Sequence, residues 1–250
     1  MSSRFFLDPK YSRLEQNHAS LGGDEARHFT KVMRGKTGSE IILFDGTGFS
    51  YLGIVENIGK KEVNIRILHR LADETESPLR LTVAAALPKG DRQRFLIEKL
   101  AELGTARFLP VSMERSVARA DNGTIDRFKR YVIEAAKQCG RNVLMEIAGE
   151  IPLQKLCREF GKEISEKSCT KFILHPLSLG NIGQTSPKQI FAEPLPAEVM
   201  VLAGPEGSFT DHEIESAQQA GFRPLELGKR ILRTETACVA AAAVFLTSAG

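Results

Sequence analysis

The sequence predicts a mixed α/β protein in which a small β-rich domain precedes a larger domain built on a mostly parallel sheet. Three observations support this fold class. Short apolar runs separated by turn signals fill roughly the first seventy residues, a polar stretch follows over residues 72–78, and apolar strands then alternate with amphipathic helices. We therefore predict a first domain over residues 1–74 and a second over residues 75–250.

The N-terminal segment has the pattern of a small barrel with one helical insertion. Residues 41–44 are an apolar run that ends at an Asp-Gly pair, and residues 49–58 continue beyond it, which predicts a hairpin. Residues 62–68 alternate polar and apolar side chains, as a half-buried strand does. Between residues 21 and 33 the apolar side chains have the spacing of a short helix.

The second segment alternates strands with helices. Residues 81–87 are continuously apolar, as in a strand that is covered on both faces. Asp91 and Thr210 are the expected N-caps of two helices, with Glu213 in the capping-box position, and Gly104 is expected to end the first of these helices. Further strands are expected at 108–111, 172–174, 199–202 and 225–227, and helices at 91–103, 125–139, 150–170, 211–220 and 236–248.

Charge and composition narrow the class of protein. The net charge is only +3, but residues 80–145 hold 13 basic and 7 acidic side chains between nearly neutral flanks. Either a polyanion-binding face or a solvated helical surface gives such a distribution. No apolar run is long enough to span a bilayer, and the N-terminus lacks the pattern of a signal peptide. The four cysteines are scattered without metal-ligand spacing, so we expect a cytoplasmic protein with no membrane and no metal partner.

Three loops lie where a parallel sheet binds its ligands, at the carboxyl ends of strands. They are residues 174–176, 203–209 and 227–236. In the second loop, Gly204 and Gly207 permit positive φ and a close backbone approach to a ligand, although a plain structural turn has the same composition.

The third of these loops is strongly basic. Lys229, Arg230 and Arg233 precede the start of a predicted helix, whose N-terminus also favours an anion. A carboxylate or phosphate ligand and a solvated helix cap both fit this pattern.

Known nucleotide-binding motifs are not met. Gly46 and Gly48 are followed by Tyr51 where the dinucleotide fingerprint requires a third glycine, and the Walker phosphate loop is also missing. A nicotinamide-dependent oxidoreductase is therefore disfavoured, and a nucleotide-type ligand would have to bind in another way.

Several motifs, in order, resemble one known family. They are ALPKGDRQRFLIEKLAELG, ERSVAR, EAAKQCGRN, LHP, AGPEGSF and LGKRILRTETA, preceded by RFF and DGTG in the barrel segment. Together they resemble the ribosomal RNA small subunit methyltransferase E group of the SPOUT superfamily, the 16S rRNA uridine-N3 methyltransferases. The resemblance covers nearly the whole chain and is weakest over residues 146–170. Ser208 departs from it, because the family commonly has a second glycine there.

The resemblance implies a PUA-like, RNA-binding barrel followed by a SPOUT domain with a deep trefoil knot. It also implies a homodimer and S-adenosylmethionine as cofactor. One residue of the implied cofactor site, His175, could equally be a core histidine whose hydrogen bonds are satisfied within the fold. Carried onto this chain, the cofactor-binding residues would be Leu174, His175, Pro176, Leu202, Ala203, Gly204, Pro205, Glu206, Gly207, Leu227, Gly228, Ile231, Leu232 and Thr236.

The implied chemistry needs a proton acceptor near uridine N3 and a cation near O2 or O4. Arg233 is the candidate cation, and Glu206 and Glu235 are the candidate bases. Each glutamate could instead be a structural carboxylate paired with Lys229 or Arg230.

The implied substrate is 16S ribosomal RNA of the small subunit, with the target base splayed out of its stack. Arginine suits phosphate pairing and base stacking. Two alternatives stay open: a SPOUT enzyme that modifies a ribose 2′-hydroxyl or another base, and an RNA-binding assembly factor without catalysis. The candidate RNA contacts are Arg4, Arg92, Arg94, Arg115, Arg119 and Arg141.

Overall fold

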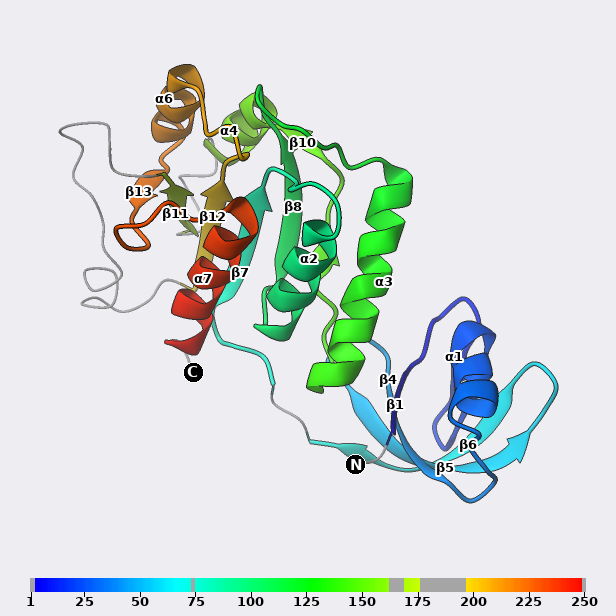
Figure 1. Cartoon of the computed structure of the whole chain (residues 1–250). Helices are drawn as coiled ribbons and strands as arrows, with labels where there is room; N and C mark the ends of the chain where they lie inside the picture. The colour runs from blue at the N-terminus through cyan, green and yellow to red at the C-terminus, as the bar shows by residue number, and fades with distance from the viewer. Residues whose placement is uncertain (1–2, 73–74, 162–168, 176–196, 249–250) are drawn as a thin grey trace. The chain divides into compact units, whose positions relative to one another are not determined.

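The structure, a computed structural model, describes residues 3–72, 75–161, 169–175 and 197–248 (Figure 1). The chain divides into two compact units. The first comprises Met1–Glu76 together with Ile133–Leu144, and the second comprises Ser77–Val132 together with Met145–Gly250. Helix α3 (Asn122–Cys139) therefore contributes residues to both units.

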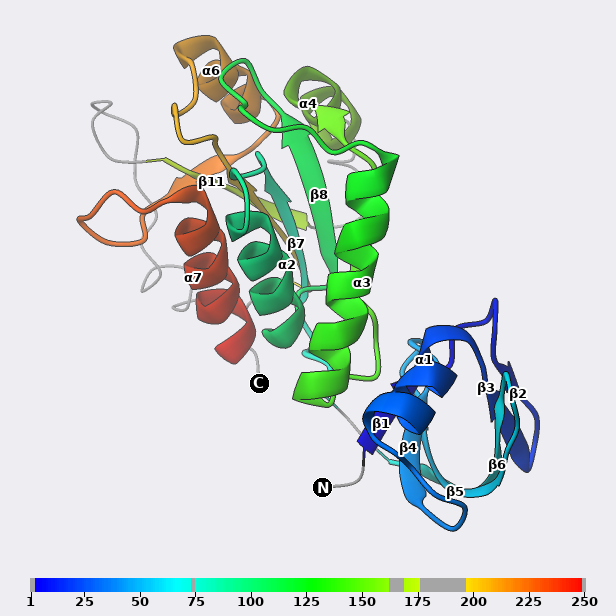
Figure 2. The same ribbon diagram turned by 45° about the vertical axis from the view of Figure 1, so that its right-hand side comes forward.

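The first unit is a six-stranded, barrel-like sheet that curves around its core (Figure 2). A short helix α1 (Gly23–Arg27) and a π-helical turn η1 (His28–Val32) are inserted between two strands, and Phe29 packs edge-to-face on Phe5 in the core. The predicted hairpin, half-buried strand and helical insertion are confirmed. The strands in spatial order are β1 (Ser3–Phe6), β4 (Glu40–Phe44), β5 (Ser50–Ile58), β6 (Val63–Leu71), β3 (His18–Leu21) and β2 (Arg13–Leu14).

Residues from the middle of the chain complete this unit. Ala136 of α3 packs in a cluster with Phe6 and Phe44, and Val143 forms a β-bridge with Thr47. These contacts are between residues far apart in the sequence, which explains why segment Ile133–Leu144 belongs to the barrel unit.

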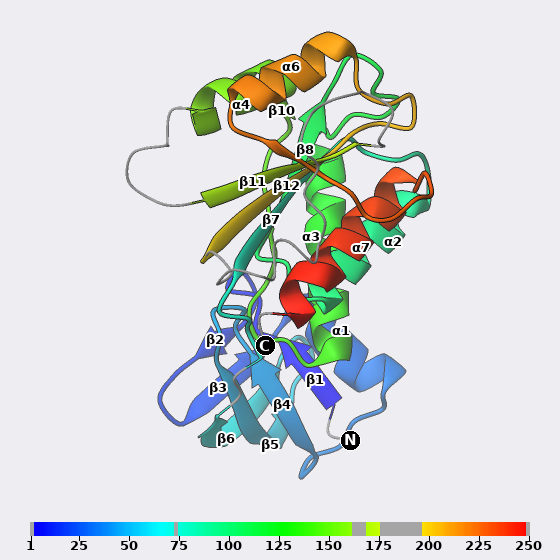
Figure 3. The ribbon, with the colours of Figure 1, turned by 90° about the vertical axis from the view of Figure 1, so that its left-hand side faces the viewer.

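The second unit is a three-layer α/β sandwich (Figure 3). All pairings of its sheet are parallel, as expected for strands connected through helices. Helices α2 (Arg92–Glu102), α3 and α7 (Thr234–Thr247) cover one face, and α4 (Leu153–Gly161) and α6 (Asp211–Gln219) cover the other. The strands in spatial order are β10 (Ile151–Pro152), β8 (Arg107–Ser112), β7 (Arg80–Ala85), β12 (Glu198–Ala203), β11 (Cys169–Leu174) and β13 (Arg223–Leu225), and β9 (Glu146–Ile147) pairs with β8.

Four neighbouring strands, β7, β12, β11 and β13, end in register. Ala203 pairs with both Ala85 and Leu174, and Leu174 pairs with Leu225. The loops that follow these strands therefore meet at a common rim. The predicted ligand loops over residues 203–209 and 227–236 belong to it, as do Leu174 and His175 of the first predicted loop.

Local sequence patterns predict some of the helix boundaries correctly and others not. Thr210 and Glu213 form the predicted capping box of α6, and Gly104 takes the positive φ of 94° expected after α2. The prediction of Asp91 as a side-chain cap is wrong, because its backbone is already helical and its carboxylate accepts no capping hydrogen bond. The third loop is preceded by β13 (Arg223–Leu225), two residues earlier than predicted.

Two expectations fall partly outside the described residues. The predicted helix over 150–170 is α4 and the start of β11, with residues 162–168 between them not described. The trefoil knot stays a prediction, because residues 176–196, which connect β11 to β12, are also outside the described part of the chain. Among the described residues, no helix is both long and apolar enough to cross a membrane.

Candidate functional site

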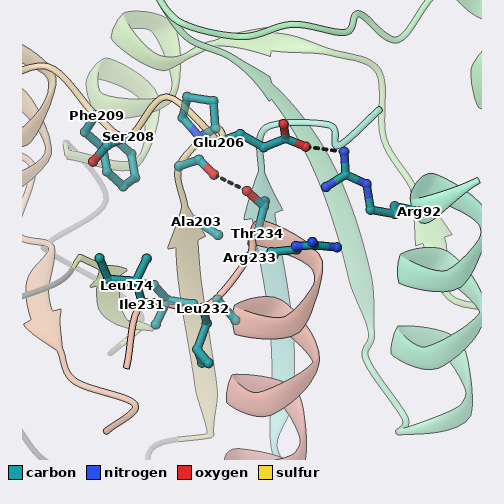
Figure 4. A pocket seen from close by; sticks show the side chains of 13 residues that line it. Arg92, Leu174, Ala203, Glu206, Ser208, Phe209, Ile231, Leu232, Arg233 and Thr234 are labelled. Carbon is teal, nitrogen blue, oxygen red and sulfur yellow. Dashed lines mark hydrogen bonds and ion pairs between the residues drawn. The ribbon is translucent and has the colours of Figure 1, made fainter. Parts of the chain in front are cut away.

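The rim loops of the second unit enclose a pocket of about 580 Å³ (Figure 4). Its walls come from the end of β12, the loop that follows it, the start of α7 and the first residue of α2. This volume is within the usual range for small-molecule and cofactor sites. The lining residues are Arg92, Leu174, Ala203, Gly204, Pro205, Glu206, Ser208, Phe209, Ile231, Leu232, Arg233, Thr234 and Ala237.

A second hollow of about 100 Å³ adjoins the first. The two share Leu174, Ile231, Leu232 and Ala237, so they form one continuous site. Ile231 is 85% exposed, which leaves a large apolar side chain at the rim for contact with a bound molecule. The second hollow is lined in addition by His175, Leu225, Glu226, Leu227, Gly228, Lys229 and Arg230.

Ten of the fourteen residues predicted to bind the cofactor line these two pockets: Leu174, His175, Ala203, Gly204, Pro205, Glu206, Leu227, Gly228, Ile231 and Leu232. Leu202 is instead fully buried in the core, and Gly207 and Thr236 do not line either pocket. Pro176 lies outside the described residues. His175 is half-buried beside the Phe209 ring, 6.1 Å between ring centroids, so it faces the site rather than the core.

Gly204 is required by the packing of the pocket wall. A Cβ on this residue would stand only 2.7 Å from the Phe209 ring, which is itself buried. The Gly204 carbonyl also accepts a hydrogen bond of 2.8 Å from the Thr234 hydroxyl, which joins the β12 loop to the start of α7 (Figure 4). Its role is therefore close approach and not the positive φ that the sequence suggested.

The positive φ in this loop belongs to Ser208, at 62°. Gly204 and Gly207, whose composition permits a positive φ, both have ordinary φ values. Ser208 closes a turn through its backbone N–H, which donates to the Pro205 carbonyl at 2.9 Å. This is the position at which the sequence departs from the glycine that is common in the family it resembles.

Ser208→Gly is expected to raise the free energy of unfolding by about 0.5–1 kcal/mol, because glycine removes the Cβ strain of the left-handed conformation. Urea unfolding measures the change. Ser216→Gly is the matched control: Ser216 lies within α6, where the same substitution should destabilise the protein by a similar amount. Equal destabilisation by both variants would contradict the argument.

A buried carboxylate links the loop after β12, which lines the pocket, to the loop after β8. Glu213, 3% exposed, accepts hydrogen bonds from the backbone N–H of Glu114 at 2.8 Å and of Thr210 at 2.9 Å. Arg115 forms a second link between these loops, because its Nη1 donates a hydrogen bond of 2.9 Å to the Gly207 carbonyl. The Glu114–Arg115 segment therefore holds the turn that forms one wall of the pocket.

The ionisable groups of the site do not pair as the sequence suggested. Arg92 forms an ion pair of 2.5 Å with Glu206 and a longer one of 3.8 Å with Glu235, whereas Lys229 and Arg230 pair with neither. Glu206 lines the pocket, but Glu235 is buried behind Arg92 and does not. Arg92, predicted as an RNA contact, is thus a residue of the pocket wall.

Arg233 lines the same side of the pocket as Arg92 (Figure 4). It precedes α7 in extended conformation, and its guanidinium forms no ion pair or hydrogen bond with any side chain that the structure describes. Arg233 therefore adds an exposed positive charge to the pocket, beside a helix N-terminus whose dipole also favours an anionic ligand.

The other arginines predicted to contact RNA differ in their surroundings. Arg94 and Arg119 are exposed and form ion pairs with Glu98 and Glu150, and the Arg94 guanidinium also lies 5.2 Å from the centroid of the Tyr131 ring. Arg4 is half-buried, and its guanidinium donates to Asn142.

Arg141 must be removed from the set of candidate RNA contacts. It is 4% exposed, and its guanidinium forms a two-pronged pair with Glu76 at 2.8 and 2.7 Å. This arginine is a structural residue of the barrel unit.

Cys238 on α7 is fully buried, and burial raises its pKa to about 12, so the thiol is protonated at neutral pH. No cluster of metal-ligating side chains occurs in the part of the chain that the structure covers.

Comparison with known proteins agrees with the architecture. Residues 75–246 match the model of an RNA methyltransferase domain, and residues 21–68 match that of an RNA methyltransferase PUA domain. The ribosomal RNA small subunit methyltransferase E of Synechocystis is 30% identical over 95% of this chain and 75% of its own length. The protein of the same name from Bacillus subtilis is 28% identical over 94% of this chain and 92% of its own.

Solved structures give the same result. A ribosomal RNA small subunit methyltransferase E from Neisseria gonorrhoeae, bound to S-adenosylmethionine, is 32% identical with a TM-score of 0.81 and covers 99% of this chain and 98% of its own. A Legionella pneumophila protein described as a methyltransferase, in complex with the same cofactor, is 31% identical with a TM-score of 0.84, over 98% and 96% of the two chains. The chain therefore belongs to the ribosomal RNA small subunit methyltransferase E family.

Proposed function

We propose that this enzyme transfers a methyl group from S-adenosylmethionine to N3 of a uridine in 16S ribosomal RNA. The observation that best supports the proposal is the composition of one pocket, in which a carboxylate (Glu206) and a cation without a side-chain partner (Arg233) stand beside the loops predicted to bind the cofactor. The names of the relatives support the methyltransferase class and the ribosomal substrate.

The walls of the site fit the cofactor. Apolar side chains of Leu174, Leu227 and Ile231 suit the adenine ring, and the loop after β12 lines the same site. When bound, S-adenosylmethionine supplies a methyl group already activated by its sulfonium.

The protein must then make N3 nucleophilic. Uridine N3 carries a proton, and its removal leaves negative charge that spreads to O2 and O4. Arg233 is placed to stabilise that charge from the helix N-terminus, and Glu206 is the pocket-lining carboxylate that can accept the proton. Holding N3 of the uridine in line with the methyl group and the sulfur of the cofactor would contribute much of the remaining rate enhancement.

One labelling experiment tests the proposal. Unmodified 30S subunits are incubated with the enzyme and radiolabelled S-adenosylmethionine, and the RNA is digested to nucleosides. Labelled 3-methyluridine is the expected product. Label at a ribose 2′-hydroxyl or on another base would assign a different target, and cofactor binding without any label on either 30S subunits or free 16S rRNA would support the non-catalytic alternative.

We propose that the RNA lies against the barrel domain, residues 1–74, and the exposed arginines of the second unit, in the basic zone over residues 80–145. We propose further that the enzyme is a homodimer, which light scattering can test, and that it acts in the cytoplasm, where its ribosomal substrate is assembled.

Arg94→Ala combined with Arg119→Ala is expected to weaken RNA binding and to lower the slope of log affinity against log salt by roughly 0.7–0.9 for each phosphate that the protein no longer neutralises. Arg115 is left intact, because its bond to Gly207 would confuse an RNA effect with a cofactor effect. Filter binding at several salt concentrations gives the slope, with Arg158→Ala on the opposite face as control. An unchanged slope would remove both arginines from the RNA interface.

A further inference from the structure

Arg92 is shared between two carboxylates that come from different loops. Its Nη2 lies 2.5 Å from Oε1 of Glu206, in the loop after β12, and its Nη1 lies 3.8 Å from Oε1 of Glu235, in the first turn of α7. Figure 4 shows Arg92 pointing from the start of α2 toward Glu206, with the ion pair between them. The closer pair is thus the one at the pocket.

The two carboxylates differ sharply in their surroundings. The Glu206 side chain is 34% exposed and lines the pocket. The Glu235 side chain is 7% exposed, and its Oε2 is buried with no hydrogen-bond partner among the described residues. A buried carboxylate oxygen without a donor is unfavourable, and its only neighbouring cation in the described structure is too distant for a hydrogen bond.

A shift of the Arg92 guanidinium toward Glu235 would offer this carboxylate the donor that it lacks. Arginine carries a planar fork that binds both oxygens of one carboxylate, and the fork of Arg92 already faces both acids. If Arg92 left Glu206 for a two-pronged pair with Glu235, its own charge would stay paired and the buried oxygen would gain a donor.

We infer that Arg92 is a two-position latch: it pairs with Glu206 in the free enzyme and moves onto Glu235 when the uridine enters, which releases Glu206 to accept the N3 proton. This inference rests on the proposed function and deepens it. In the step, the N3–H bond breaks, the proton goes to a Glu206 oxygen and the electron pair stays on N3. Glu206 later returns the proton to solvent, to which it is partly exposed.

The latch explains why a paired carboxylate can serve as a base. An ion pair stabilises the charged form of a carboxylate and so weakens it as a proton acceptor. Transfer of Arg92 to Glu235 removes that stabilisation only when the substrate is present. Glu235 is then a positioning residue, since it acts through Arg92 and does not line the pocket.

The first test uses the free protein and needs no turnover. Arg92→Ala should lower Tm by roughly 5 °C, because it leaves the buried Glu235 carboxylate without a counter-charge. Glu235→Gln in the same chain should restore most of that loss. Additive losses in the double variant would show that Arg92 and Glu235 are not coupled and would overturn the latch.

The second test separates a latch from a fixed anchor. Glu235→Gln removes the second position and keeps Arg92 on Glu206, so kcat should fall at least tenfold. Arg92→Ala added to Glu235→Gln frees Glu206, and kcat should recover at least threefold over the single variant. A fixed, catalytic Arg92 predicts the opposite, a double variant slower than either single one.

The matched control is Glu102→Gln, which breaks the Lys99 pair on the same helix and should leave Tm and kcat unchanged. Failure of the proposed function is distinguishable from failure of the latch. If wild-type enzyme labels a nucleoside other than 3-methyluridine, uridine N3 is not the target and the proposed function fails. The rescue of Tm by Glu235→Gln still reports whether Arg92 and Glu235 are coupled. If 3-methyluridine forms but the double variant shows no recovery, the latch alone is wrong.

Discussion

Arg233→Ala is expected to lower kcat by roughly 10²–10³ while leaving the Kd for S-adenosylmethionine within about threefold, because it removes the cation that stabilises charge only as N3 loses its proton. The same substitution should not unfold the protein, since Arg233 is exposed and its guanidinium has no side-chain partner in the described structure. Single-turnover methylation of 30S subunits measures the rate, and calorimetric titration measures cofactor binding.

Two further variants sharpen this prediction. Arg233→Lys keeps the charge but loses the planar fork, so we expect partial activity between that of alanine and wild type. Arg158→Ala removes an exposed arginine from α4, on the other face of the sheet, and should retain full activity. Full turnover by Arg233→Ala would refute its catalytic role, and a loss confined to RNA affinity would make it an RNA anchor.

The order of secondary structure could be predicted because it depends on local patterns. Continuous apolar runs mark the buried parallel strands, and the capping box at Thr210 and Glu213 marks the start of α6. The three rim loops follow from the same patterns, since parallel strands that end in register bring their loops together.

Contacts between distant residues could not be predicted in the same way. The helical pattern of α2 gives no sign that Arg92 reaches the loop after β12, so the sequence suggests an RNA contact for Arg92 and a nearby lysine or arginine as the partner of Glu206. Gly204 and Ser208 show a related limit, because composition identifies a tight loop but not which residue takes the positive φ.

Lys171 is a further case. On the sequence it is a polar residue beside an apolar strand, yet it is 8% exposed in the structure. Its ammonium donates to the carbonyls of Phe160 and Ala220, at the ends of α4 and α6, where the helix dipoles favour a cation. Only the packing of two helices against β11 creates that environment.

Glu213→Ala is expected to have the largest effect on stability, a loss of about 2–4 kcal/mol in the free energy of unfolding. The substitution removes the acceptor for the backbone N–H groups of Thr210 and Glu114 and breaks the capping box of α6. Because those bonds also fix the wall of the pocket, affinity for S-adenosylmethionine should fall by about tenfold in the protein that remains folded. Urea unfolding and calorimetric titration below the transition measure the two effects.

Glu215→Ala is the matched control for Glu213, since Glu215 is an exposed residue two positions further along the same helix. It should change the free energy of unfolding by no more than about 0.5 kcal/mol. If both variants were equally stable, the carboxylate of Glu213 would not hold the loops. If Glu213→Ala lost stability but kept full cofactor affinity, the fastening would serve the fold alone, and the pocket wall would have to be held by the Arg115 bond to Gly207.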